Sequence, residues 1–225
     1  GRLQVLLATG SQSHRESAEL TEHAGRCGAD AVLVLTPYFI RPPQRGMAAY
    51  LADLARRTDL PFLVYHIPGR AAVELGVDTL VDLAGSADNF VGVKHASTDL
   101  GWVSDALARL GPEFRVLCGL EEMTFPMLAI GAAGMVNAVA NLIPRRVADV
   151  YQAVADGKLE EARRLHFELL ELNRAIFFET NPIPLKYMMR RVGLLERNEH
   201  RLPMLPPGPE LEARLDGVLE GTGLL

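Results

Sequence analysis

Few cysteines, a shortage of basic residues and the lack of a long apolar run set the first limits on this chain. Its two cysteines, Cys27 and Cys118, stand in unlike contexts, so we expect no disulfide framework and no metal cluster, only reduced, buried thiols. The 23 Lys and Arg are outnumbered by 28 Asp and Glu, and the net charge of −5 offers no basic face to nucleic acid or an anionic membrane. No run of about 18 apolar residues is present, so no membrane span is expected. These features predict a cytoplasmic protein without nucleic-acid or membrane partners.

Strand-like and helical segments alternate along most of the 225 residues. Short apolar runs predict strands at 3–8, 31–35, 61–65, 90–94, 115–118 and 134–138. Amphipathic segments between them predict helices at 13–27, 44–58, 77–87, 100–110 and 122–130. The alternation is typical of an α/β fold, a parallel sheet covered by helices, and it fits a barrel or a doubly wound open sheet equally well.

The strands stop after about residue 143, and four helices follow. We expect these helices at 145–155, 159–178, 184–192 and 209–219, with prolines at their joints. The chain therefore divides into a barrel portion, 1–155, and a helical C-terminal extension, 156–225. Six strands are two fewer than a closed (β/α)₈ barrel needs, so in a barrel the first two βα units would be absent from this chain. The start at Gly1, almost directly in a strand, looks like a cut edge.

Lys94 ends an apolar strand and is the first candidate for chemistry. A strand that is apolar on both faces is covered on both sides, and a charge at its end is costly to desolvate without a partner or a role. An amine in a dry pocket loses its proton more readily and attacks carbonyls, so Lys94 is a candidate Schiff-base lysine. The alternative is a lysine that extends into solvent at the strand end and has no chemical role.

Residues at the carboxyl ends of neighbouring strands would converge on one mouth. Tyr65 ends the strand before that of Lys94, and a phenol beside an amine suits proton transfer during imine formation. Pro68 and Gly69 predict a tight turn that aims Arg70 at the mouth, where a guanidinium could grip a carboxylate. The alternatives are a packed strand-end tyrosine and a surface arginine. No strand ends offer a His and carboxylate ligand set, so metal-dependent chemistry is not expected.

These motifs together resemble the dihydrodipicolinate synthase / N-acetylneuraminate lyase family of class I pyruvate-dependent aldolases, and most closely its synthase branch. The resemblance is carried by Tyr-His-Ile-Pro-Gly-Arg at 65–70 and Gly-Val-Lys-His-Ala-Ser at 92–97. Further landmarks lie at 36–38, 117–119, 181–186 and 201–204. The likeness covers the whole chain, from the family's third strand to its terminal helices.

The resemblance implies a fold and a catalytic pair. The fold would be a (β/α)₈ TIM barrel with a C-terminal helical extension. Lys94 would form an imine with pyruvate or another 2-oxo acid, and Tyr65 would relay protons. Arg70 would bind the carboxylate of an aldehyde partner, which in the synthase branch is aspartate semialdehyde.

The resemblance also implies a substrate pocket, the cofactor requirement and an assembly. Gly119 and Val136 would line the pyruvate pocket, and Tyr38 would be a further substrate-binding residue. No cofactor is implied, because the covalent imine with the lysine carries the chemistry. Members of the family are commonly homo-oligomers, so a tetramer or dimer is expected.

Three departures separate the chain from the family pattern. The family's Gly-Thr-Thr-Gly loop, which binds the 2-oxo acid carboxylate, has no counterpart here. The relay tyrosine that a neighbouring subunit donates aligns with Phe39, which has no hydroxyl. His95 follows the lysine where the family often has an acidic residue, and His66 stands where asparagine is common; the two histidines either retune the acid–base chemistry or simply pack.

Two classes of function therefore stay open. The first is a Schiff-base-forming enzyme of the dihydrodipicolinate synthase type, or its relative, a sugar-acid aldolase or 2-oxo-3-deoxy acid dehydratase. The second is a catalytically impaired ligand-binding protein on the same scaffold, which the missing carboxylate loop would favour.

Overall fold

The computed structural model describes residues 2–225, which form two compact units. Unit 1 comprises residues 2–120 and 130–135, and unit 2 comprises residues 121–129 and 136–225. The boundary expected after residue 155 divides the barrel portion from the helical extension, whereas units 1 and 2 are defined by compactness. The boundary after residue 155 therefore stays a prediction.

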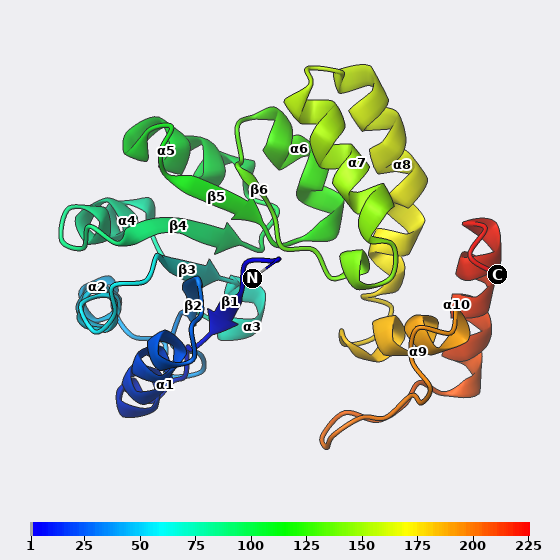
Figure 1. Cartoon of the computed structure of the whole chain (residues 1–225), viewed down its shortest axis with the longest axis horizontal. Coiled ribbons are helices and arrows are strands. Elements are labelled where there is room, and N and C mark those ends of the chain that lie inside the picture. The colour runs from blue at the N-terminus through cyan, green and yellow to red at the C-terminus, as the bar shows by residue number, and fades with distance from the viewer. Residues whose placement is uncertain (1) are drawn as a thin grey trace. The chain divides into compact units, whose positions relative to one another are not determined.

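Unit 1 contains one parallel sheet of six strands in sequential order, curled into a half-barrel (Figure 1). The strands are β1 (Leu6–Ala8), β2 (Ala31–Leu35), β3 (Phe62–His66), β4 (Phe90–His95), β5 (Arg115–Cys118) and β6 (Gly134–Met135). Each strand pairs only with its neighbours in the chain, as successive βα units of a barrel do. The expectation of an α/β fold with a parallel sheet is confirmed.

Helices cover the convex face of this sheet (Figure 1). They are α1 (His14–Arg26), α2 (Gln44–Ala55), α4 (Val77–Ala84) and α5 (Leu100–Leu110). Side-chain caps fix two of their starts, because Ser13 accepts from the Glu16 amide and Asp99 accepts from the Trp102 amide. Strand residues that face the helices, such as Val64 and Val93, are fully buried and form the core with the apolar stripes of the helices.

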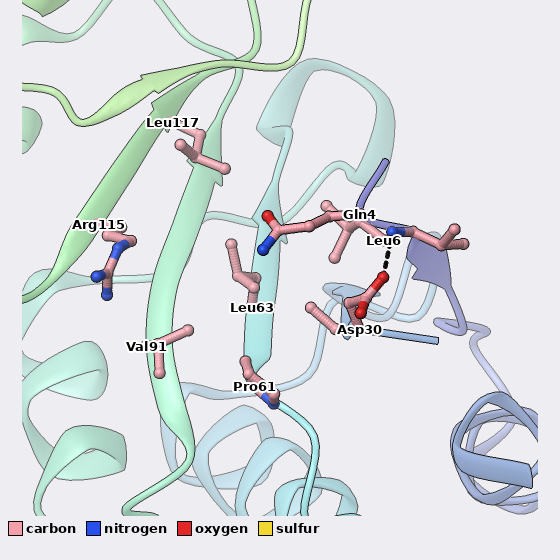
Figure 2. Close-up of a pocket in the computed structure, with 10 residues that line it drawn as sticks. Gln4, Leu6, Asp30, Pro61, Leu63, Val91, Arg115 and Leu117 are labelled. Carbon is pink, nitrogen blue, oxygen red and sulfur yellow. Dashed lines mark hydrogen bonds between the residues drawn. The ribbon is translucent and has the colours of Figure 1, made fainter. Parts of the chain in front are cut away.

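The opposite, concave face of the sheet borders a cavity of about 510 Å³ (Figure 2). Its lining is largely apolar and includes Leu63, Val91 and Leu117 from three successive strands. Gln4 points from the segment before β1 toward Leu63, and Asp30 accepts a 2.7 Å hydrogen bond from the Val5 amide. In a closed barrel such inward side chains fill the interior in layers.

The regular secondary structure of unit 2 is helical. It comprises η1 (Glu121–Met123), α6 (Thr124–Ala129), η2 (Val139–Asn141), α7 (Pro144–Ala155), α8 (Leu159–Ala175), α9 (Ile183–Arg191) and α10 (Pro209–Gly221). Asp216 of α10 accepts hydrogen bonds from Tyr187 at 3.0 Å and Arg191 at 2.7 Å, which joins α9 to α10. The helical character expected for the end of the chain is therefore confirmed.

Several predicted details need correction. The first strand begins at Leu6 rather than residue 3, and the last ends at Met135 rather than residue 138. The turn expected at Pro68 and Gly69 is a one-turn helix, α3 (Pro68–Ala71), with proline at its start. Cys118 is buried as expected, but Cys27 is exposed at the end of α1, where its thiol lies 3.1 Å from His23 Nε2.

Candidate active site

Lys94 and Tyr65 lie side by side on the concave face, near the carboxyl ends of β4 and β3. The two residues are direct partners in the parallel register of these strands. The Lys94 Nζ atom lies 4.0 Å from the centre of the Tyr65 ring, and both side chains are half-buried. An ammonium over an aromatic face is held by the electrostatic attraction of the ring. The juxtaposition expected from the strand ends is therefore present.

Gly119 has no side chain, and the Lys94 side chain occupies the space that a larger residue there would fill. Gly119 directly follows β5 and donates its amide to the His95 carbonyl at 2.8 Å. A Cβ atom at this position would lie 2.8 Å from Lys94 Cε and 3.0 Å from Lys94 Cγ. Such distances are shorter than van der Waals contact, so a glycine here allows the lysine to lie along the sheet toward Tyr65.

Arg70 lies in α3, directly after the strand that carries Tyr65. Its side chain is exposed, and the next helix residue, Ala71, is fully buried and anchors the turn. Ala72 ends α3 in the left-handed conformation with φ of 58°, which reverses the chain toward α4. The structure thus places the arginine at the same edge of the sheet as the lysine–tyrosine pair.

Tyr38 and Phe39 occupy the loop that follows β2. The loop is tied to the next βα segment of unit 1, because the Thr36 amide donates to the Tyr65 carbonyl and the Phe39 amide donates to the Ala71 carbonyl, each at 3.2 Å. Phe39 is 82% exposed and has a φ of 72°, a strained conformation for an aromatic residue. Its neighbours Tyr38 and Ile40 are exposed as well, by 36% and 55%.

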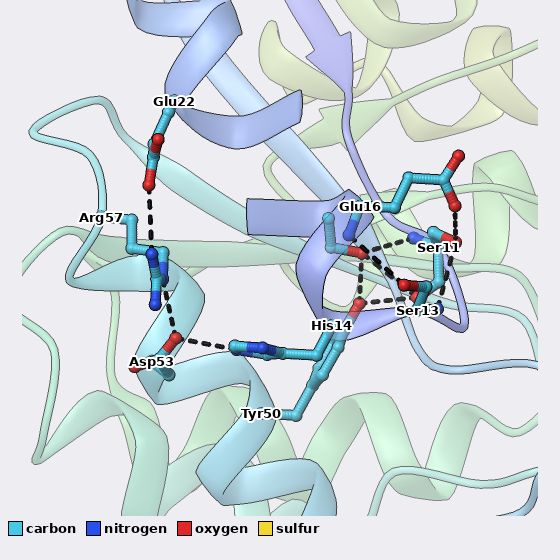
Figure 3. A network of polar contacts seen from close by, with 9 residues as sticks. Ser11, Ser13, His14, Glu16, Glu22, Tyr50, Asp53 and Arg57 are labelled. Atoms are coloured by element: carbon cyan, nitrogen blue, oxygen red, sulfur yellow. Dashed lines mark hydrogen bonds and ion pairs between the residues drawn. The ribbon is translucent and has the colours of Figure 1, made fainter. Parts of the chain in front are cut away.

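A hydrogen-bonded network lies at the carboxyl end of β1, around the start of α1 (Figure 3). The Tyr50 hydroxyl contacts Ser17 Oγ at 2.6 Å and donates to the Ser11 carbonyl at 2.7 Å. Ser11 Oγ in turn donates to the Glu16 carboxylate at 2.5 Å. Burial raises the pKa of Tyr50, although its hydrogen bonds to Ser17 and Ser11 act in the opposite direction.

His66 and His95 point away from the lysine–tyrosine pair, into the helical layer, because successive strand residues face opposite sides of a sheet. Both are fully buried, and their Nδ1 atoms lie 3.1 Å apart. Trp102 of α5 stacks on both rings, and the distance between ring centres is 4.4 Å to His95 and 4.9 Å to His66. The reading of these histidines as packing residues fits this arrangement.

The hydrogen bonds of this stack define the proton positions. The Leu75 amide donates to His66 Nε2 at 3.2 Å, so His66 carries its proton on Nδ1 and donates it to His95. Burial, with a smaller effect from His95, lowers the pKa of His66 to about 3. Burial likewise lowers the pKa of His95 to about 4, although Asp99 acts in the opposite direction. Both rings are therefore neutral at neutral pH.

Val136 directly follows β6, is half-buried and belongs to unit 2.

Among residues 2–225, no three His, Cys, Asp or Glu side chains gather as a metal site would require. Within the same residues, no helix has both the length and the apolarity for crossing a bilayer.

Trp102 and Leu75, which hold the histidine pair, were not predicted as site residues from the sequence. Trp102 is the only tryptophan in the chain, and a single tryptophan in the helix after the lysine strand is a signal that could have been followed. Leu75 carries no such signal, because it contacts His66 and Trp102 through its backbone amide and carbonyl, which every residue type except proline has.

Comparison with known sequences gives a consistent result. A sequence model of the Dihydrodipicolinate synthetase family matches residues 1–220. A protein of Thermus thermophilus, named 4-hydroxy-tetrahydrodipicolinate synthase, is 44% identical over 226 residues, covering 100% of this chain and 75% of that protein. A protein of the same name from Aquifex aeolicus is 38% identical over 224 residues, covering 100% of this chain and 76% of that protein.

Comparison with solved structures agrees. The crystal structure of dihydrodipicolinate synthase from Aquifex aeolicus matches with a TM-score of 0.97 and 38% identity, covering 100% of this chain and 76% of the other. The chloride-inhibited enzyme of the same name from Acinetobacter baumannii, solved with pyruvate, matches with a TM-score of 0.95 and 32% identity, again covering 100% and 76%. Each relative therefore includes residues that have no counterpart in this chain.

Proposed function

Because the chain belongs to the dihydrodipicolinate synthetase family, as its sequence predicts, we propose that it condenses pyruvate with aspartate semialdehyde through an imine on Lys94. The observation that carries the proposal is the position of the Lys94 Nζ atom, 4.0 Å from the centre of the Tyr65 ring. A primary amine beside a phenol has both the nucleophile and the proton donor that imine formation needs.

The reaction follows from these two groups. The Lys94 amine adds to the ketone carbon of pyruvate, and the resulting carbinolamine loses water to give the imine. Loss of a proton from the methyl carbon gives an enamine, which forms the new carbon–carbon bond to the aldehyde while the aldehyde oxygen takes up a proton. Hydrolysis then releases the product and restores the amine. Tyr65 passes the protons in these steps, and no cofactor or metal takes part.

The remaining site residues bind the substrates. Arg70 binds the carboxylate of the aldehyde substrate through its guanidinium, for which its exposed position after β3 is suited. Gly119 borders the pyruvate, and Tyr38 contributes from the loop after β2; the role implied for Val136 stays a prediction.

The Arg70 assignment is tested by Arg70→Ala with steady-state kinetics. We expect the KM for aspartate semialdehyde to rise about 10-fold or more and the KM for pyruvate to change little, since a charge-assisted carboxylate contact stabilises by about 1.5–3 kcal/mol. Arg109→Ala, which changes an exposed arginine paired with Asp78 on the helical layer, is the control and should leave both KM values unchanged. An unaltered KM for the aldehyde in Arg70→Ala would remove the carboxylate role.

We further propose that two βα units complete the half-barrel into a closed (β/α)₈ barrel and bring the carboxylate-binding loop. The open cavity of about 510 Å³ against the concave face supports this, as do relatives longer than this chain. The complete gene product provides the test: a Gly-Thr-Thr-Gly loop upstream is expected, and its absence would favour the ligand-binding alternative. A homo-oligomer, dimer or tetramer, in the cytoplasm stays a prediction.

Phe39 supports one alternative within the family. A phenylalanine cannot pass a proton, so a different aldehyde partner, or a dehydration of a 2-oxo-3-deoxy acid, is the second candidate. Turnover of a sugar acid faster than that of aspartate semialdehyde would select it, with the same imine on Lys94.

A further inference from the structure

Leu75 is the point at which the buried ring stack holds the segment that carries Arg70. Its amide donates to His66 Nε2 at 3.2 Å, and its carbonyl accepts from Trp102 Nε1 at 2.8 Å. Leu75 itself is fully buried. Both backbone polar groups of one loop residue are thus bound by side chains from two other elements, β3 and α5.

We propose that Trp102 is a positioning residue, which fixes the segment 67–75 and thereby the guanidinium of Arg70 relative to Lys94. The inference rests on the proposed function, because it assigns Arg70 to the aldehyde carboxylate. It concerns a residue of the helical layer, on the side of the sheet opposite Lys94 and Tyr65.

The segment depends on such an anchor. Helix α3 has four residues, which is too short to be stable by itself, and Ala72 is strained in the left-handed region. The segment starts at the end of β3, is held at Ala71 by burial and by the Phe39 amide, and reaches its next buried anchor at Leu75. Within so short a chain, a shift of Leu75 is passed on to α3 and to Arg70.

A second anchor meets the same segment from the other side. Gln44, at the start of α2, donates to the Glu74 carbonyl at 2.7 Å and accepts from the Gly76 amide at 3.0 Å. Leu75 is therefore bracketed, with α2 holding the residues on either side of it and the ring stack holding its own backbone. Anchoring of this kind from separate elements is what keeps a short binding segment in place.

The rings of the stack also link this segment to the catalytic strands. His66 directly follows Tyr65, and His95 directly follows Lys94, so the two histidines fix the ends of β3 and β4 from the convex side. Trp102 lies over both rings and donates to Leu75. One side chain thus touches the strand ends that carry the pair and the loop that carries the arginine.

Trp102→Phe tests the inference, because it keeps an aromatic ring in the stack and removes the N–H that binds Leu75. We expect the KM for aspartate semialdehyde to rise about 10-fold, while borohydride trapping of the pyruvate imine keeps its rate. Gln44→Met, which loosens the same loop from the α2 side, should show the same pattern. Tyr187→Phe, which removes one side-chain hydrogen bond in unit 2, is the control and should change neither value.

Hydrogen–deuterium exchange gives a readout that does not need turnover. The peptide covering residues 67–76 should exchange several-fold faster in Trp102→Phe than in the parent protein, and peptides from β3 and β4 should not. Unchanged exchange in 67–76, or an equal change of the KM values for both substrates, would overturn the positioning role. Failure of the parent protein to trap pyruvate at Lys94 would instead count against the proposed function, and the exchange result would still decide the inference.

Discussion

At the residue scale, Gly119 is the clearest case of a side chain whose absence the site requires. The family resemblance implied that Gly119 lines the pyruvate pocket, and the structure shows that Lys94 occupies the space beside it. That neighbour could not be derived from the sequence, because the contact depends on the direction that the lysine side chain takes along the sheet. The proximity of Tyr65 and Lys94 was easier to predict, since the apolar pattern alone locates the ends of their two strands.

Gly119→Ala should slow the chemistry more than it lowers the stability. The added Cβ would lie 2.8 Å from Lys94 Cε, and the flexible lysine would move away from Tyr65 to relieve the clash. We expect imine trapping to slow by about 10-fold or more, with the free energy of unfolding lowered by about 1 kcal/mol or less. The control is Gly25→Ala in α1, where a Cβ meets nothing within 4 Å and trapping should be unchanged. Equal trapping rates in the two variants would contradict the assigned contact.

The buried pair His66 and His95 predicts a pH dependence of stability. Their pKa values in the folded protein, about 3 and about 4, lie below the ordinary value of 6.5, so only the unfolded chain takes up these protons as the pH falls below 6.5. The free energy of unfolding should therefore be highest above about pH 7 and should fall toward pH 4, by up to about 1.4 kcal/mol per pH unit for each ring.

Urea denaturation between pH 7 and pH 5 measures this effect. His166 and His200 also have pKa values lowered by burial, so part of the slope is theirs. The double variant His66→Gln, His95→Asn should keep only that part and show a clearly smaller slope. A double variant with the slope of the parent protein would mean that the ring pair does not set the acid response.

At the element scale, the strand order was predictable and some of the ends were not. Alternating apolar and amphipathic segments located all six strands, because each must be buried between the concave interior and the helices. The start of β1 was missed because the Val5 amide bonds to the Asp30 side chain instead of extending a strand. Helix α3 was missed because one turn has no periodicity to read.

Helices α1 and α2 are joined by two kinds of polar contact, which should differ in strength (Figure 3). Tyr50 makes part-buried hydrogen bonds to Ser17 and Ser11, whereas Asp53 of α2 meets His14 of α1 at an exposed position, where it also pairs with its own neighbour Arg57. Tyr50→Phe should lower the free energy of unfolding by about 1–2 kcal/mol, and Asp53→Asn by about 0.5 kcal/mol or less. Chemical denaturation of both variants in low and high salt checks this, and a larger loss in Asp53→Asn would reverse the ranking.

At the scale of the whole molecule, the sheet is curled into a half-barrel that carries the proposed lysine–tyrosine pair. The order β1 to β6, the helices on the convex face and the lysine–tyrosine pair are all properties of unit 1. The cavity against the concave face was not predictable in its lining, because the side chains that meet there come from strands far apart in sequence. The fold class and the family could be read from the sequence, whereas the ring stack behind the site could not.

Imine formation by the Lys94 amine is tested most directly by trapping it with borohydride. The protein is incubated with pyruvate, reduced with borohydride, digested and weighed by mass spectrometry. If Lys94 forms the imine, one pyruvate-derived group is added to the peptide that contains Lys94, and none is added in Lys94→Ala. Absence of the added mass in the parent protein, or its presence on another lysine, would contradict the claim that Lys94 forms the imine.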